Sequence, residues 1–211
     1  MKKNIEVEYI GKISKEKLEA LREKLETDGI FKKRKERISF MYFRDSIPND
    51  ISEIKEENTD LRIRITNKEP EIIVKSGLFT GAHFRKEISI AFPLDEIEKY
   101  IDFLSALGWN LGVIYAAETF VYEYKGIEIS LVNIEDYGYN FEAEILTTKE
   151  EEEYARKKIQ ATLVELNLKQ FDEERLNKQC NEINNRKAFR FDFSKQSFKE
   201  IQEKYPKFLK I

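Results

Sequence analysis

Short segments in which apolar and charged residues alternate are the feature that most restricts the fold of this chain. Near its start, three apolar residues alternate with two glutamates: Ile5, Val7 and Tyr9 with Glu6 and Glu8. A period of two residues predicts a β-strand with one apolar and one polar face. Two carboxylates are therefore expected side by side on this strand. The segment 141–146 repeats the arrangement with Glu142 and Glu144.

The strands expected between these two segments carry basic side chains on their polar faces. In the segment 60–65, Arg62 and Arg64 alternate with apolar residues. The next two segments, 71–75 and 83–92, contribute further charged residues: Lys75, Arg85 and Glu87. Strands 38–43, 113–115, 119–124 and 127–132 complete the set, and the basic stretch 30–37 precedes the first of them.

Helical periodicity and capping residues interrupt the strands at a few places. Ser14 is placed to cap a helix over residues 15–27, Pro93 opens one that ends near 107, and another is expected over 149–166. Many short antiparallel strands tend to close into a barrel. The sequence thus predicts an α+β fold, with an eight-stranded antiparallel β-barrel and flanking helices in residues 1–170. A helical C-terminal extension over 171–211 is expected to pack on the barrel.

Composition limits the classes of partner. The chain of 211 residues has 37 basic and 40 acidic side chains, a net charge of −3, so nothing favours a general nucleic-acid binder. Cys180 is the only cysteine, which excludes an intrachain disulfide and favours a reducing compartment; we expect the cytoplasm. No apolar run is long enough to span a membrane, so no membrane partner is expected.

If the polar faces of these strands point inward, they line a tunnel with charges of both signs. Arginine side chains there would bind a polyphosphate, and clustered carboxylates would bind Mg²⁺ or Mn²⁺. A metal with a cationic clamp is typical of phosphoryl transfer. The alternative is an ordinary sheet with one solvated face, on which mixed charges form cross-strand pairs.

An ordered set of short motifs resembles the CYTH domain, also called the triphosphate tunnel metalloenzymes. The motifs are Glu6-x-Glu8, Leu-Arg-Ile-Arg at 61–64, Lys75, Arg85-x-Glu87 and Glu142-x-Glu144. Together they cover roughly residues 4–166, and the Tyr-Glu-Tyr-Lys-Gly run at 122–126 is similar to a branch described as class IV adenylate cyclase-like. The resemblance implies an eight-stranded tunnel that acts on triphosphates with a divalent metal, as adenylate cyclases and thiamine triphosphatases do.

The same resemblance assigns roles to individual residues. It implies metal ligands at Glu6, Glu8, Glu142 and Glu144, with Mg²⁺ or Mn²⁺ as the cofactor. The catalytic set is then Glu6 and Glu8, assisted by Glu87. The residues expected to bind phosphate are Arg62, Arg64, Lys75 and Arg85, to which the strand positions add Lys12 and Arg37.

Four positions depart from the pattern of the CYTH domain. Its members carry basic residues at the positions of Ile10, Ala117 and Glu118, and many carry an Asp at the position of Val132. Lys12, which has the same strand parity as Ile10, is the candidate replacement. Two functions therefore stay open: a triphosphate hydrolase or nucleotide cyclase, and a protein that binds a nucleotide or other polyphosphate without turnover. A structural barrel is the third reading. The alternating Phe189, Phe191 and Phe193 of the tail are expected to pack over one end of the barrel, with a homodimer contact as the alternative.

Overall fold

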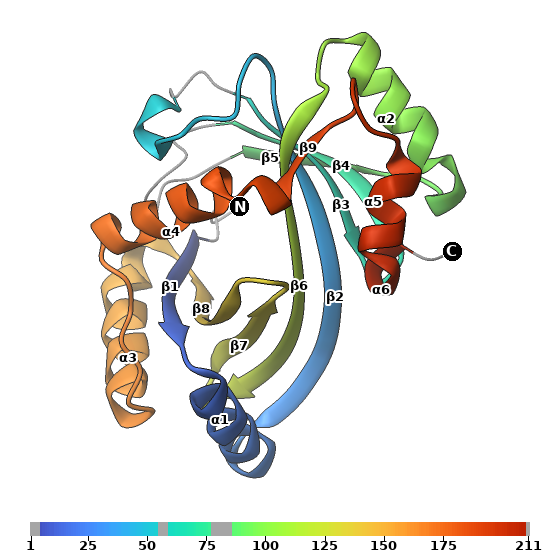
Figure 1. Ribbon diagram of the computed structural model, residues 1–211. Helices are drawn as coiled ribbons and strands as arrows, with labels where there is room; N and C mark the ends of the chain where they lie inside the picture. Colours follow the sequence, from blue (N-terminus) through green and yellow to red (C-terminus); the bar gives the residue numbers. More distant parts are fainter. Residues whose placement is uncertain (1–4, 55–58, 77–85, 210–211) are drawn as a thin grey trace. The chain divides into compact units, whose positions relative to one another are not determined.

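The computed structural model describes residues 5–54, 59–76 and 86–209. The chain forms two compact units, one of Met1–Lys35 and Ala117–Glu174 and the other of Glu36–Ala116 and Arg175–Ile211. Two long strands, β2 (Ile30–Phe43) and β6 (Leu111–Tyr124), contribute to both units (Figure 1). The expected division into a tunnel domain and a C-terminal extension at residue 170 stays a prediction.

The strands follow the order β1 (Ile5–Ile13), β8 (Gly138–Thr147), β7 (Ile127–Ile134), β6, β2, β3 (Asp60–Thr66), β4 (Glu69–Ser76) and β5 (Lys86–Ala91), and the short strand β9 (Arg190–Asp192) pairs with β6. The prediction of an α+β fold with one large antiparallel sheet is confirmed. Among the described residues the strand order is open, with β1 at one end and β5 at the other, rather than closed into a barrel. The sheet also has one strand more than the sequence predicts, because the C-terminal segment supplies β9.

The first unit places two helices against one face of its strands. It contains β1 (Ile5–Ile13), α1 (Lys15–Asp28), β7 (Ile127–Ile134), β8 (Gly138–Thr147), the 3₁₀ turn Lys149–Glu151 and α3 (Glu152–Glu165). As expected, Ser14 caps α1, and its side chain accepts a hydrogen bond from the Lys17 amide at 3.2 Å. Leu21 and Leu25 of α1 and Ile159 of α3 are buried in one apolar cluster with Phe141 of β8. Strand geometry then puts Glu142 and Glu144 on the opposite face.

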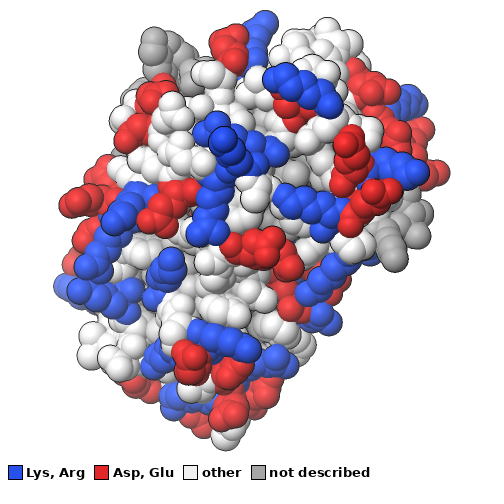
Figure 2. Space-filling model, in the orientation of Figure 1, with Lys and Arg blue, Asp and Glu red and all other residues white. Residues whose placement is uncertain are grey.

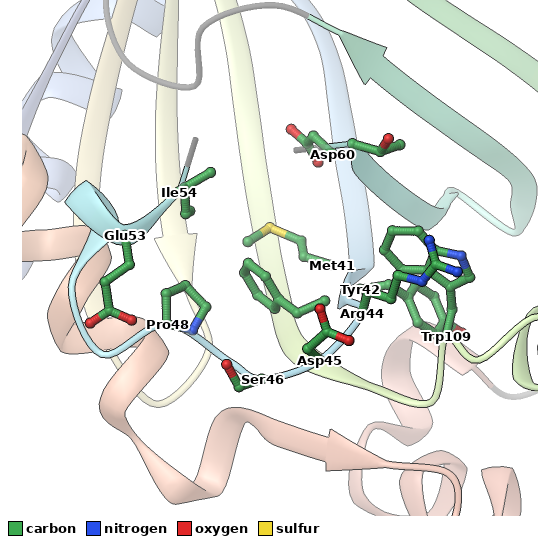
Figure 3. A pocket seen from close by; sticks show the side chains of 12 residues that line it. Met41, Tyr42, Arg44, Asp45, Ser46, Pro48, Glu53, Ile54, Asp60 and Trp109 are labelled. Atoms are coloured by element: carbon green, nitrogen blue, oxygen red, sulfur yellow. The ribbon is translucent and has the colours of Figure 1, made fainter. Parts of the chain in front are cut away.

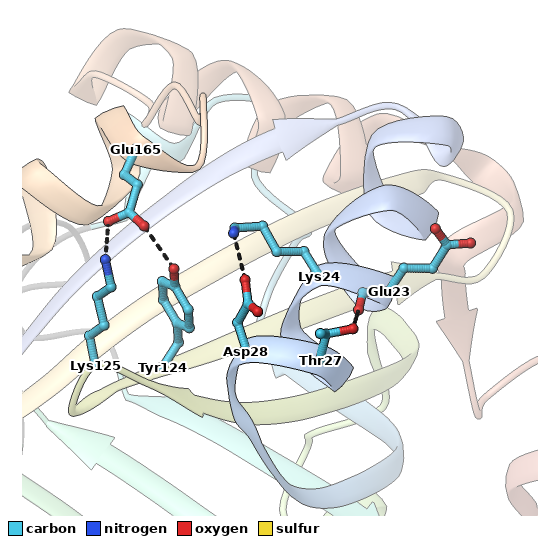
Figure 4. Close-up of polar contacts among 7 residues, drawn as sticks. All are labelled: Glu23, Lys24, Thr27, Asp28, Tyr124, Lys125 and Glu165. Atoms are coloured by element: carbon cyan, nitrogen blue, oxygen red, sulfur yellow. Dashed lines mark hydrogen bonds and ion pairs between the residues drawn. The ribbon is translucent and has the colours of Figure 1, made fainter.

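Ion pairs fix the ends of these helices. Glu165, at the end of α3, accepts hydrogen bonds from the Tyr124 hydroxyl at 2.7 Å and from Lys125 Nζ at 2.5 Å (Figure 4). Lys24 and Asp28 pair at 2.7 Å within the last turn of α1. The two hydrogen bonds of Glu165 anchor α3 to the turn that joins β6 and β7.

Gly11 marks the closest approach of two segments in the first unit. A Cβ atom at this position would lie 2.3 Å from the Lys169 carbonyl oxygen and 2.4 Å from the Phe141 ring. The segment after α3 is also bonded to β1, since the Phe171 amide donates to the Ile10 carbonyl at 2.7 Å. A glycine is therefore required for β1 to fit between this segment and the core.

The second unit builds a core from both of its sequence segments. It contains β3 (Asp60–Thr66), β4 (Glu69–Ser76), β5 (Lys86–Ala91), α2 (Ile97–Ala106), most of α4 (Glu173–Asn185), β9 (Arg190–Asp192), α5 (Phe198–Lys204) and α6 (Pro206–Leu209), with 3₁₀ turns at Ile51–Glu53, Leu94–Glu96 and Lys187–Phe189. Phe191 of β9 is 1% exposed, and its ring centroid lies 5.6 Å from that of Phe40 and 5.0 Å from that of Tyr42. Phe191 thus belongs to the core of this unit, and Phe193 packs against it.

Strand β2 starts eight residues before the predicted strand at Ile38, because it includes the basic stretch 30–37. Two cations of this stretch pair with carboxylates of β6 in the first unit. Lys32 Nζ lies 2.8 Å from Glu123 Oε2, and Arg34 pairs with Glu118. The basic stretch is therefore a strand whose charges pair across strands, and Glu118, one of the departures from the CYTH pattern, is the partner of Arg34.

Candidate metal and phosphate sites

A row of four glutamates crosses four neighbouring strands of the first unit. Glu8 of β1 lies opposite Glu144 of β8, which lies opposite Glu128 of β7, which in turn lies opposite Glu123 of β6. Like charges on directly opposite strand positions destabilise a sheet. The row therefore concentrates negative charge on one face, and a bound cation would relieve its repulsion.

Three of the four predicted metal ligands come together. Glu6, Glu8 and Glu144 each offer a carboxylate oxygen, and these oxygens lie within 4.8 Å of one another. Hard divalent cations such as Mg²⁺ and Mn²⁺ prefer carboxylate oxygens, so this donor set fits them. The fourth predicted ligand, Glu142, lies two residues before Glu144 on β8. It is opposite Ile10 of β1 and Ser130 of β7.

The charge at the centre of the row changes the acidity of Glu144. The pKa of its carboxyl is raised from 4.5 to about 7. Burial is the largest cause, followed by the charge of Glu6, a hydrogen bond with Glu6 and the charges of Glu128 and Glu142. A carboxyl group held partly protonated at neutral pH exchanges its proton for a metal ion when one binds.

Glu128 and Glu123 were not identified from the sequence as site residues. The strand over 127–132 was predicted, but which of its residues face Glu144 depends on the register between strands. Glu123 differs from the centre of the row, because the hydrogen bond from Lys32 lowers the pKa of its carboxyl. The row thus ends at Glu123, whose carboxylate is paired with Lys32. The carboxyl pKa that is raised strongly is that of Glu144.

The apolar departures from the family pattern lie next to this row. Ile10 is opposite Glu142, and Val132 is opposite Asn140, which itself pairs with Lys12. Asn140 is 4% exposed, and its Oδ1 has no hydrogen-bond partner in the described part of the chain. The sequence analysis did not single out this buried amide, which lies between Val132 and Lys12 in the sheet.

Lys12 and Ala117 have simple structural settings. Lys12 is exposed, and its Nζ lies 4.7 Å from the centre of the Tyr137 ring, close enough for a cation–π contact. Strand parity places it on the face of β1 that carries Glu6 and Glu8. Ala117 is 2% exposed and lies opposite Ile134, so it packs as an apolar strand residue.

The two arginines expected to bind phosphate lie in the second unit, and each already contacts a carboxylate. Arg62 donates from Nε and Nη2 to the two carboxylate oxygens of Asp60, each at 2.7 Å. Arg64 Nε lies 2.9 Å from Glu71 Oε1. The Arg62–Asp60 pair is fork-shaped, and such pairs are strong because both partners are charged. The sequence analysis did not single out Asp60 or Glu71, and both neutralise a predicted phosphate ligand.

The remaining basic candidates occupy the same sheet. Lys75 lies opposite Asp60 on one side and Glu87 on the other. Arg37 donates from Nε to Thr66 Oγ1 at 3.1 Å. The side chain of Glu87 and the whole of Arg85 lie outside the described residues, so their predicted roles stay predictions. Basic and acidic side chains are intermixed over the face of the molecule in Figure 2.

Comparisons with known proteins show the fold. No family model and no curated protein matches the chain. Among solved structures, a Pyrococcus horikoshii protein whose name states no activity is 25% identical over 84% of this chain and 99% of its own, with a TM-score of 0.62.

Two further solved structures carry names that state an activity. A "putative adenylyl cyclase" from Hippeastrum, described as having a dominant triphosphatase activity, is 15% identical over 84% of this chain and 96% of its own, with a TM-score of 0.55. A "putative adenylate cyclase" from Vibrio parahaemolyticus is 15% identical over 94% of this chain and 98% of its own, with a TM-score of 0.54. The resemblance predicted from the motifs is thus confirmed at the level of the fold.

Within the described residues, no helix combines the length and the apolar character needed to cross a membrane.

Proposed function

We propose that this protein is a divalent-metal-dependent phosphoryl-transfer enzyme that acts on a nucleotide or another triphosphate. The observation that carries the proposal is the carboxylate cluster of Glu6, Glu8 and Glu144, with oxygens within 4.8 Å of one another. The likeness in fold to a Hippeastrum protein described as a triphosphatase supports the same reaction class.

In this proposal, Glu6, Glu8 and Glu144 hold Mg²⁺ or Mn²⁺. When bound, the metal neutralises phosphate charge and polarises the phosphoryl group. The carboxylates fix the position of the ion, and Glu144 releases its proton as the ion binds. Glu128 and Glu142 add negative charge nearby and so favour a divalent over a monovalent ion.

The candidates to bind phosphate groups, as the resemblance in sequence implies, are Arg62, Arg64 and Lys75 of the second unit. Arginine offers five N–H donors, so a guanidinium that contacts a carboxylate can still donate to a phosphate oxygen. Asp60 and Glu71 nevertheless reduce the attraction, because they already neutralise Arg62 and Arg64. We therefore expect weaker triphosphate binding than unpaired arginines would give.

The test is a substrate panel of ATP, thiamine triphosphate and tripolyphosphate, each with Mg²⁺, Mn²⁺ or EDTA. Release of phosphate and pyrophosphate is measured, and mass spectrometry separates a cyclic nucleotide from a diphosphate product. The control is Glu8→Gln, because Glu8 is exposed and the amide keeps the shape of the side chain. We expect metal-dependent turnover that falls at least about tenfold in the variant, since losing even a partner of a metal ligand costs about 10- to 100-fold. Equal rates for the two proteins, or turnover unaffected by EDTA, would contradict the proposal.

A second candidate function is nucleotide binding without turnover. It is favoured because the chain has fewer basic side chains at the expected phosphate-binding positions than the CYTH pattern has. Ile10 and Ala117 replace charged residues of the relatives, and Arg62 is neutralised by Asp60. This function predicts that a nucleotide raises the melting temperature while mass spectrometry recovers it unchanged. Recovery of a chemically altered nucleotide would exclude it.

A further inference from the structure

A pocket of about 320 Å³ opens in the second unit, at the end of β2 (Figure 3). The last residues of β2, parts of the segment 44–54, the residues at 59–60 and Trp109, which precedes β6, line the pocket. Its volume is at the lower end of the range of about 300–1,000 Å³ that is usual for small-molecule sites. The pocket therefore has room for one small organic molecule.

Four charged side chains line the pocket, and two of them are already engaged. Asp60 accepts two hydrogen bonds of 2.7 Å from Arg62, and Glu53 accepts one of 3.2 Å from a backbone amide three residues before it. The other two, Arg44 and Asp45, are exposed, and neither has a hydrogen bond or an ion pair with the described part of the chain. They are neighbours in sequence but do not pair with each other. The lining thus offers one accessible positive charge and one accessible negative charge.

These two charges lie at different places in the lining. Figure 3 shows Arg44 beside Trp109 on one side of the pocket, whereas the Asp45 carboxylate points into the pocket. Much of the remaining lining is apolar, since it comes from Met41, Phe43, Pro48 and Ile54. A ligand that satisfies the whole pocket therefore needs an anionic group, a cationic group and an apolar part.

The balance of charges restricts the ligand further. Asp45, Glu53 and Asp60 contribute three carboxylates, against the single guanidinium of Arg44, so a phosphate group would be repelled. A ligand with only a cationic group would leave Arg44 without a partner, and a ligand with only a carboxylate would do the same to Asp45. A free α-amino acid carries both groups on one carbon, and hydrogen bonds between charged groups are strong.

We propose that this pocket binds a free α-amino acid with an apolar side chain. Arg44 donates hydrogen bonds to its carboxylate, Asp45 accepts them from its ammonium group, and Met41 and Trp109 contact its side chain. This site goes beyond the proposed phosphoryl-transfer function, because it uses neither the carboxylate cluster of the first unit nor a metal. Its test accordingly needs no triphosphate and no turnover.

The experiment titrates the full-length protein, without metal, with leucine, isoleucine and methionine. Trp109 lines the pocket and is the only tryptophan of the chain, so its emission reports on binding, and isothermal calorimetry measures binding independently. We expect saturable binding of at least one of the three amino acids. The absence of a saturable signal in both measurements would overturn the inference.

Two analogues of the amino acid that binds most tightly test its two charges. The amide keeps the ammonium group and lacks the carboxylate, whereas the N-acetyl derivative keeps the carboxylate and lacks the ammonium group. Each should bind about ten- to a hundredfold more weakly than the amino acid, the usual effect of losing one hydrogen bond between charged groups. An analogue that binds as tightly as the amino acid would refute the recognition of the group that it lacks.

Variants of the two side chains assign each charge to its partner. Arg44→Gln should weaken the binding of the amino acid by the same factor but not that of the amide. Asp45→Asn should weaken the binding of the amino acid but not that of the N-acetyl derivative. Because both side chains are exposed and unpaired within the described residues, the two variants should melt at the temperature of the parent.

The matched controls are Arg186→Gln and Asp95→Asn, which change exposed residues of the same unit outside the pocket lining. Both should bind the amino acid as the parent does. If Arg44→Gln weakened the amide as much as the amino acid, its effect would be structural rather than a lost contact with the carboxylate, and the assignment would be refuted. Unchanged affinity for the amino acid in both pocket variants would overturn the proposal.

Discussion

The two units of this protein arrange their charges in opposite ways. In the first unit, Glu6, Glu8 and Glu144 have carboxylate oxygens within 4.8 Å of one another, and the pKa of Glu144 is raised to about 7. In the second, Arg62 is held by Asp60 through two hydrogen bonds of 2.7 Å. The acidic cluster thus carries repulsion that a cation would relieve, whereas the arginine is neutralised by a neighbour on its own strand.

The largest effect is expected from removing the partner of Arg62. Asp60→Asn leaves a guanidinium whose side chain is only 20% exposed without its carboxylate, which itself is 6% exposed. Loss of one partner of a buried pair costs about 3–5 kcal/mol, so the free energy of unfolding should fall by that amount in a urea titration. If Asp60 neutralises Arg62, tripolyphosphate should also bind more tightly to the variant, as isothermal calorimetry can measure.

The matched variant is Glu71→Gln, which removes the partner of Arg64. The Glu71 side chain is 24% exposed, so its loss should cost less than that of Asp60. A variant Asp60→Asn as stable as the parent would show that the second unit does not depend on the pairing, and the contrast between the units would fail.

A smaller effect, dependent on pH, is expected in the acidic cluster. The folded-state pKa of Glu144, about 7, lies above its ordinary value of 4.5, so the folded protein binds the proton more tightly than the unfolded chain. Its contribution to stability is therefore present below about pH 4.5 and is lost as the pH rises to about 7. The melting temperature of the parent should fall, relative to that of Glu144→Gln, over this window.

Mg²⁺ or Mn²⁺ should raise the melting temperature of the parent most above pH 7, where the proton no longer competes for Glu144. Glu150→Gln is the control, because Glu150 is exposed and its carboxyl pKa is lowered rather than raised. Melting curves of the parent and Glu144→Gln that stay parallel across pH 4.5–7 would contradict the assignment.

The smallest effect is expected at the far end of the glutamate row. Lys32 and Glu123 pair at 2.8 Å with side chains that are 44% and 43% exposed, and exposed pairs contribute little to stability. Lys32→Gln should return the lowered pKa of Glu123 to its ordinary range, which NMR titration of the carboxyl carbon can follow. The melting temperature should not change measurably. A loss of stability in Lys32→Gln as large as that in Asp60→Asn would contradict this prediction. It would mean that the exposure of an ion pair does not determine how much the pair stabilises the protein.

The local periodicity of the sequence was sufficient to predict most of the helices and strands. The alternation of Glu6 and Glu8 with apolar residues predicted β1 and its charged face, and α1 begins after Ser14 as expected. The strand over residues 30–37 was missed because its charges, paired with those of β6, resemble a solvated basic patch when read alone. Sheet closure was predicted wrongly for the described strands, since nothing in the sequence shows how the first and last strands of a sheet meet.

The site was only partly predictable for a related reason. Residues two apart on one strand, such as Glu142 and Glu144, are recognisable from spacing. The contribution of Glu128 depends on the register between β7 and β8, and the pairing of Asp60 with Arg62 depends on side-chain geometry at a strand start. The pocket at Trp109 lies at irregular segments, where periodicity gives no signal.

The strand order of the first unit has a consequence for how the molecule folds. β6, β7 and β8 are joined by short turns, so Glu128 and Glu144 become neighbours through local hairpins. β1 comes from the other end of this unit's sequence and pairs with β8, a non-local contact that forms slowly. If β1 docks after these hairpins have formed, it brings Glu6 and Glu8 against Glu144 and adds their repulsion at that step. Acid or a divalent cation during refolding should therefore accelerate this step.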